Sequence, residues 1–246
     1  MNDFDSAAIA GVLCLAAGVL VPLLISRIPE PEPKDEPVEA DSGAPPAEPV
    51  APEDPKERYA DIATLPGLAW KSALASGVAA ALIGLSLGWD WSLLVILPLV
   101  PISVALAVVD WRTRLLPTKV VAPSYVLTIA MVLVVFAITH DLDDLTRAGL
   151  GWLVAGGLFF VLWFIYPPWM GYGDVRLAGV LGIALGHLGW GPLVFGVWCG
   201  FLLGGIGGSL LALLRIVERK AYPFGPFMLI GALVGILAGD AILGSR

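Results

Sequence analysis

The sequence predicts an all-α integral membrane protein, a polytopic bundle of about eight transmembrane helices. Hydrophobic residues make up 58% of the 246 residues and charged residues only 14%, well outside the composition of soluble domains. Long apolar runs recur along the chain, and about 18 apolar residues suffice to cross a bilayer. Helices are expected because lipid cannot satisfy open backbone groups. The expected spans are residues 7–27, 68–88, 91–109, 119–138, 148–166, 175–189, 191–216 and 225–244.

The first span belongs to the first of three expected domains, residues 1–28. Its leading residues include Asp3 and Asp5 but no Lys or Arg, whereas a signal peptide begins with a basic region. We therefore expect an uncleaved transmembrane helix. Cys14 and Cys199 lie in separate apolar runs and the chain has no CxxC pair, so we interpret both as small buried residues rather than zinc ligands.

The second expected domain, residues 29–67, is acidic and rich in proline. It holds eleven of the 21 acidic residues and ten of the 20 prolines, with very few large apolar side chains. Such a segment cannot bury enough apolar surface to fold, so we expect a disordered linker. The third domain, residues 68–246, holds the other seven spans. No basic cluster indicates nucleic-acid binding.

The basic residues predict the orientation in the membrane. If the N-terminus is outside, twelve of the 14 Lys and Arg residues fall on the cytoplasmic side, and only Arg147 and Arg246 fall outside. We therefore expect both termini outside and the linker in the cytoplasm. The twelve are Arg27, Lys34, Lys56, Arg58, Lys71, Arg112, Arg114, Lys119, Arg176, Arg215, Arg219 and Lys220.

Two acidic residues stand out as candidates for chemistry. Ionisable groups are costly inside membranes, and each is therefore a functional candidate. The other acids lie in the linker, at the N-terminus, in loops or near outer helix ends, whereas Asp110 closes the third span and Asp174 opens the sixth. Both are expected at the cytoplasmic surface. From the residues alone two interpretations remain open: a helix cap at Asp174 with an interfacial Asp110, or a functional pair.

Three motifs occur in order at the membrane boundaries. They are Asp110 six residues before Leu116-Pro117, Gly171-Tyr172-Gly173-Asp174 followed by Arg176-Leu177, and Pro223-Phe224-Gly225-Pro226-Phe227. Together they resemble the motifs of the prepilin peptidases, the type IV leader peptidase family of GxGD intramembrane aspartic proteases. The resemblance covers roughly residues 68–244. Two substitutions depart from the usual pattern: Arg176 stands where Lys is usual, and Thr118 stands where Asn or Asp is common.

The resemblance implies an aspartic endopeptidase with Asp110 and Asp174 as its catalytic pair. Its substrates would be type IV prepilins or pseudopilins, cut after a Gly between a short basic leader and an apolar helix. The site would lie near the cytoplasmic face of the bacterial inner membrane, surrounded by lipid, and would need no metal or cofactor. The remaining motif residues would line the substrate: Pro117, Gly171, Gly173, Arg176, Pro223, Phe224, Gly225 and Pro226. For Arg176 itself, contact with lipid phosphate is the simpler interpretation.

The N-terminal part differs from many relatives, which also N-methylate the new terminus. Those proteins carry a Gly-Ser-Phe-Leu-Asn segment and a cytoplasmic domain with two CxxC pairs. Here Val19 and Pro22 replace the Ser and Asn, and the acidic linker replaces the zinc domain. We therefore expect no N-methyltransferase activity.

Two alternative functions remain. One is a presenilin-like GxGD protease of other membrane helices, and the other is a proton-coupled transporter that uses Asp110 and Asp174 as a relay. Other protease classes lack their residues: there is no HExxH motif, and His140 and His187 both map to the outer side. The glycines between Gly200 and Gly208 indicate close helix packing rather than a serine-protease motif.

Overall fold

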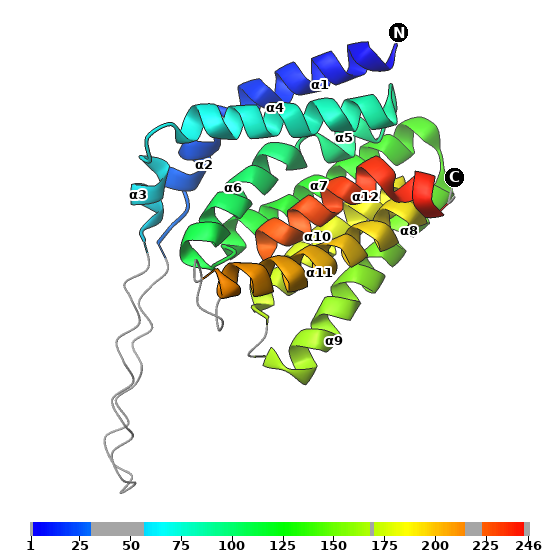
Figure 1. The fold of residues 1–246 in the computed structure, drawn as a ribbon. Helices are drawn as coiled ribbons and strands as arrows, with labels where there is room; N and C mark the ends of the chain where they lie inside the picture. Colours follow the sequence, from blue (N-terminus) through cyan, green and yellow to red (C-terminus); the bar gives the residue numbers. More distant parts are fainter. Residues whose placement is uncertain (1, 31–56, 168–169, 215–222, 244–246) are drawn as a thin grey trace, which may run out of the picture.

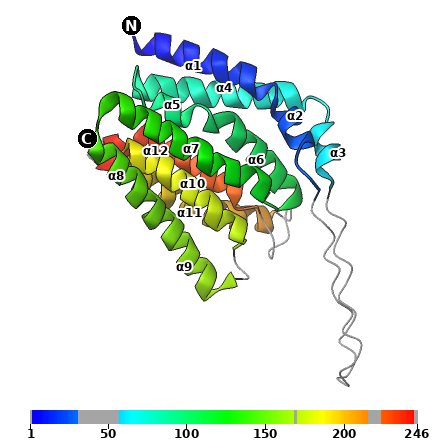
Figure 2. The ribbon, with the colours of Figure 1, turned by 180° about the vertical axis from the view of Figure 1, so that it is seen from behind.

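The computed structural model describes residues 2–30, 57–167, 170–214 and 223–243, and within these ranges every regular element is a helix (Figure 1). This confirms the predicted all-α fold. α1 and α4 run along one edge of the bundle, and α8 and α9 run along the opposite edge (Figures 1 and 2). In chain order the helices are α1 (Asp3–Gly18), α2 (Val21–Ser26), α3 (Tyr59–Ala63), α4 (Leu68–Leu87), α5 (Leu93–Ile96), α6 (Leu99–Thr113), α7 (Thr118–Thr139), α8 (Leu142–Gly151), the π-helix Trp152–Gly156, α9 (Gly157–Ile165), α10 (Tyr172–Leu188), α11 (Trp190–Leu213) and α12 (Gly225–Leu243).

Six of the predicted spans are present as helical stretches long and apolar enough to cross a membrane. α5 and α6 together form one of them, and α8, the π-helix and α9 together form another. The chain is therefore a polytopic membrane protein. Over the described residues the six are Leu68–Leu87, Leu93–Thr113, Thr118–Thr139, Leu142–Ile165, Trp190–Gly207 and Gly225–Leu243.

The first predicted span, residues 7–27, is not one continuous helix. It divides into α1, which has 16 residues, and the short α2. Pro22 explains the break, because it has no N–H for the helical hydrogen bond and its ring would clash with the carbonyl of Gly18. Pro22 instead lies in the first turn of α2, where proline is tolerated.

The sixth predicted span forms α10, the most enclosed helix of the bundle. Its 17 residues would extend about 25 Å, slightly less than the apolar core of a bilayer. Twelve of them are buried, and the helix contacts α7, α8, α9, α11 and α12. The expected number of eight membrane-crossing helices is thus not confirmed, because α1 and α10 are both too short to count as spans by length.

Glycines allow α11 and α12 to pack closely, as predicted for Gly200–Gly208. A Cβ atom at Gly204 would lie 2.3 Å from the Phe224 ring, and one at Gly207 would lie 2.6 Å from the Phe227 ring. From the other side, a Cβ atom at Gly231 would lie 2.4 Å from the backbone nitrogen of Gly200. Small residues at such an interface let two backbones approach closely. Gly208 lies outside the residues whose side chains are described.

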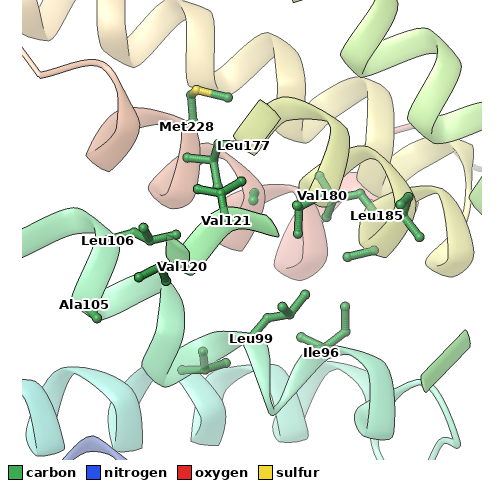
Figure 3. Packing of buried hydrophobic residues seen from close by; sticks show 14 of the residues in the cluster. Ile96, Leu99, Ala105, Leu106, Val120, Val121, Leu177, Val180, Leu185 and Met228 are labelled. Carbon is green, nitrogen blue, oxygen red and sulfur yellow. The ribbon is translucent and has the colours of Figure 1, made fainter. Parts of the chain in front are cut away.

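A layer of buried apolar side chains joins α6, α7, α10 and α12 (Figure 3). Figure 3 shows Leu106, Val121, Leu177 and Met228 in this layer. Each lies about one helical turn from a residue of the three sequence motifs: Asp110, Pro117, Asp174 and Gly225, respectively. Because the layer packs these four turns together, it brings the motif residues to the same end of the bundle.

The C-terminal end of the acidic segment is helical and packed, which differs from the prediction for residues 57–67. α3 lies in that range and packs against α2 and α6, with Tyr59 and Ile62 buried. These two residues are spaced as on one helix face, and they are among the few large apolar side chains of the segment. The Ala60 N–H donates to the Glu30 carboxylate at 3.1 Å, so the two ends of the segment meet. Residues 31–56 lie outside the described part of the chain.

Candidate active site

Asp110 lies in the last turn of α6 and is 4% exposed. Its Oδ2 atom accepts a hydrogen bond of 2.9 Å from the N–H of Gly225, the first residue of α12. The helix that carries Asp110 ends directly afterwards, at Arg114, whose φ of 56° is left-handed. The Asp110 carboxylate is therefore buried between α6 and the start of α12.

Asp174 lies in the first turn of α10 and is 8% exposed. Its Oδ2 atom accepts a hydrogen bond of 3.1 Å from the N–H of Gly171, the N-cap residue of α10. The helix-cap interpretation of Asp174 is thus correct. It does not exclude the functional pair, because Gly173 beside Asp174 and Gly225 beside Asp110 both lie against Leu116.

Leu116 joins the three motifs by packing between two glycines. A Cβ atom at Gly173 would lie 2.8 Å from the Leu116 Cβ atom, and one at Gly225 would lie 3.4 Å from Leu116 Cδ2. The Cβ atom at Gly225 would also lie 2.7 Å from the Asp110 carboxylate. Only glycine fits at these two positions without displacing a neighbour. Gly171 is less crowded, since a Cβ atom there would meet the Asp174 carboxylate at 3.5 Å.

Pro117 and Arg176 support the site from its rim. Pro117 is the N-cap residue of α7, in extended conformation. The Arg176 guanidinium lies over the Tyr172 ring, 4.6 Å from its centre, and donates to the Thr118 hydroxyl. The Tyr125 hydroxyl donates to the Arg176 carbonyl at 2.9 Å. Arg176 therefore joins α10 to α7, a role that sequence reasoning missed because partners 51 and 58 residues apart leave no local pattern.

The Pro223–Pro226 segment begins α12, as predicted, and anchors it through Phe224. The Phe224 ring lies 5.8 Å from the Phe201 ring and 6.0 Å from the Phe159 ring, measured between centres. Pro223 and Gly225 are buried, and Pro226 follows in the first turn of the helix. Because Phe224 is held by these two aromatic contacts and by Gly204, the neighbouring Gly225 N–H is held against Asp110.

Several other ionisable groups of the described residues lie away from this pair. Asp90 and Asp141 cap short helical segments, and Asp144 pairs with Arg147. His187 lies in the last turn of α10, at the opposite end from Asp174. No group of three or more His, Cys, Asp or Glu within the described ranges could hold a metal ion.

The sequence is related to known membrane peptidases. Residues 97–213 match the type IV leader peptidase family. Relatives named "Prepilin leader peptidase/N-methyltransferase" are 32% identical in Pseudomonas putida, 30% in Pseudomonas aeruginosa and 31% in Escherichia coli, over 69%, 69% and 53% of this chain. The alignments span 59%, 58% and 57% of those relatives, less than two thirds of their length.

No solved structure matches this chain. The matched residues include both Asp110, in the last turn of α6, and Asp174, in the first turn of α10. The chain is thus similar to the type IV leader peptidase family over residues 97–213, which hold two of the three motifs.

Proposed function

We propose that the chain is an intramembrane aspartic endopeptidase in which Asp110 and Asp174 activate water. The observation that supports it most is that two buried carboxylates from different helices both lie beside glycines that pack against Leu116. Two such groups cannot easily both ionise, so one proton is shared between them. The ionised member would take a proton from water while the protonated member polarises the scissile carbonyl. Neither role requires a metal or an organic cofactor.

Backbone N–H donors would hold the two carboxylates in fixed positions. The Gly225 N–H binds one oxygen of Asp110, and the Gly171 N–H binds one oxygen of Asp174. Such bonds restrict the rotation of both carboxylates, and fixed geometry is what a positioned acid and base contribute to the rate. The scissile peptide of the substrate would lie between the carboxylates of Asp110 and Asp174.

The substrate would be a type IV prepilin or pseudopilin with a basic leader. The relatives' names support a prepilin leader peptidase. The pair lies at the end of the bundle that carries Arg112, Arg114 and Lys119, and such ends face the cytoplasm. In the bacterial inner membrane, a basic leader would remain on that side and present its junction with the apolar helix to Asp110 and Asp174.

The alternatives are less well supported by the site. A proton-coupled transporter would place its acids near the middle of the membrane, whereas Asp110 and Asp174 lie at helix ends. A presenilin-like protease of other helices would share the dyad but not the Pro223–Phe227 motif. Cleavage of a purified pilin precursor, compared with an unrelated membrane helix, distinguishes the three functions.

The dyad predicts that either carboxylate is indispensable. Asp110→Asn and Asp174→Asn should each abolish cleavage of a pilin precursor, and the double variant should be no worse, because residues that act as a unit are non-additive. Asp90→Asn and Asp240→Asn should retain activity, and chelators or serine-directed reagents should have no effect. Near-normal turnover by either single variant, at matched stability, would exclude the aspartic mechanism.

We also propose that the chain does not methylate its product. The segment that precedes the linker carries Pro22, which breaks the helix between α1 and α2, and the chain has no CxxC pair. Mass spectrometry of a precursor processed by the purified protein with S-adenosylmethionine should show an unmethylated N-terminus. A methylated terminus would refute the proposal.

A further inference from the structure

An apolar groove lies in the bundle close to the Asp110 end of α6. It has a volume of about 280 Å³ and is lined by α4, α5, α6, α10 and α12. At one end it reaches Ala107, one helical turn before Asp110, and Pro226, which follows the Gly225 that binds Asp110. The groove therefore ends about one helical turn from Asp110.

The groove runs along the helices rather than across them. Its lining extends from Ala107 to Leu99 on α6 and from Pro226 to Ile236 on α12, so the α12 side is about 15 Å long at the rise of an α-helix. At the outer end α4 is joined to α12, since the Ser86 hydroxyl donates to the Ile236 carbonyl at 3.3 Å. The groove thus has α4 and α12 joined at the end away from the site, and its other end lies near Asp110.

Small side chains create the space, and the rim faces the membrane. Ala75 and Ala79 of α4 and Ser103 and Ala107 of α6 line the groove, and Ser103 is the only polar residue among its lining. Ala75 and Ile230 on its rim are exposed, so an apolar segment could enter between α4 and α12 from the membrane. The volume is below the roughly 300–1,000 Å³ of pockets that enclose a whole small ligand. It has room for a few apolar side chains, not for a helix.

We propose that this groove receives the apolar side chains that follow the scissile bond, from the face of the substrate's membrane helix that lies against α4 and α12. The inference rests on the proposed function and deepens it. A peptide cut at Asp110 and Asp174 continues from the site into the membrane, and the groove is the apolar surface that starts about one helical turn from Asp110. It would select substrates by the size and hydrophobicity of their first apolar residues.

Filling the groove tests the proposal. Ala79→Leu and Ser103→Leu should raise the KM for an intact pilin precursor about tenfold, as expected when one or two apolar side chains lose their burial, with kcat little changed. A precursor whose first apolar residues are replaced by alanine should show a smaller increase in KM. Ala130→Leu, an equal change at an exposed position of α7, should leave the KM for both substrates unchanged.

Photo-crosslinking tests docking without relying on turnover. A photoreactive residue at Val104 in the Asp174→Asn variant should form an adduct with the residues just after the cut. Adducts with lipid alone, or an unchanged KM in both filled variants, would overturn the groove proposal while cleavage by the unmodified protein continues. If the unmodified protein cleaves no pilin precursor at all, the proposed function itself fails, which is a different result.

Discussion

At the scale of single residues, the site needs glycines without side chains as much as it needs the two aspartate carboxylates. Gly225 donates its N–H to Asp110 from a position where any Cβ atom would press on the same carboxylate. Gly173 leaves room for Leu116 next to Asp174. The Gly225–Asp110 hydrogen bond and the packing around it therefore both require glycine. One methyl group added at Gly225 would disturb both.

This crowding predicts that Gly225→Ala damages catalysis without removing any functional group. The new methyl would displace the Asp110 carboxylate, and a misplacement of about 1 Å can reduce a rate by about 100-fold. Cleavage of a pilin precursor should fall by roughly that factor in kcat, as should that of Gly173→Ala. Gly205→Ala is the matched control, because no atom lies within 4 Å of a Cβ built there. Normal kcat in Gly225→Ala would show that the contact is not needed.

At the scale of elements, the site forms because four helix turns share one apolar layer. Leu106, Val121, Leu177 and Met228 lie about a turn from the motif residues of their own helices (Figure 3). The sequence predicted most of the helices and placed Asp110 and Asp174 at helix ends, because apolar run length and an acidic residue beside an apolar run are local signals. It did not predict the Pro22 break or α3, because these depend on a single proline and on two apolar residues at helical spacing.

The packing around α3 predicts that most of the acidic linker is dispensable for cleavage. The ends of the segment meet through Glu30 and Ala60, and Arg112 next to the site binds Glu57 at 3.1 Å. Deleting residues 36–53 would leave these contacts in place, and a shorter loop between fixed ends costs little entropy. Detergent-purified protein with this deletion should cleave a pilin precursor at nearly the normal rate.

A complete loss of activity in the deleted protein, with folding intact, would show that the linker helps to form the site. Ile62→Ala is an informative comparison, because Ile62 is 1% exposed between α2 and α6. Removing such a buried side chain typically costs about 2–5 kcal/mol of stability. Thermal unfolding should therefore begin at a lower temperature in Ile62→Ala than in the linker deletion.

At the scale of the whole molecule, the candidate site lies at one end. The last turn of α6, the first turn of α10 and α3 lie at the end of the bundle opposite the start of α1 and the end of α12 (Figures 1 and 2). Basic residues gather at the same end, and Arg147 lies near the other. The number of membrane-crossing helices was harder to predict than this uneven distribution of basic residues. The reason is that α1 and α10 are short and are stabilised by packing against neighbouring helices rather than by their length.

This polarity predicts the topology, with the active end in the cytoplasm and both termini outside. The prediction rests on the twelve-to-two division of Lys and Arg and on the position of the site at the basic end. In a variant without Cys14 and Cys199, single cysteines at Pro45 and Leu142 report the two sides. A membrane-impermeant thiol reagent applied to intact cells should label Leu142→Cys, which is 62% exposed at the start of α8. Pro45→Cys should be labelled only after lysis. The reverse pattern would place Asp110 and Asp174 outside, where a basic leader held in the cytoplasm could not reach them, and would contradict both the topology and the proposed cleavage.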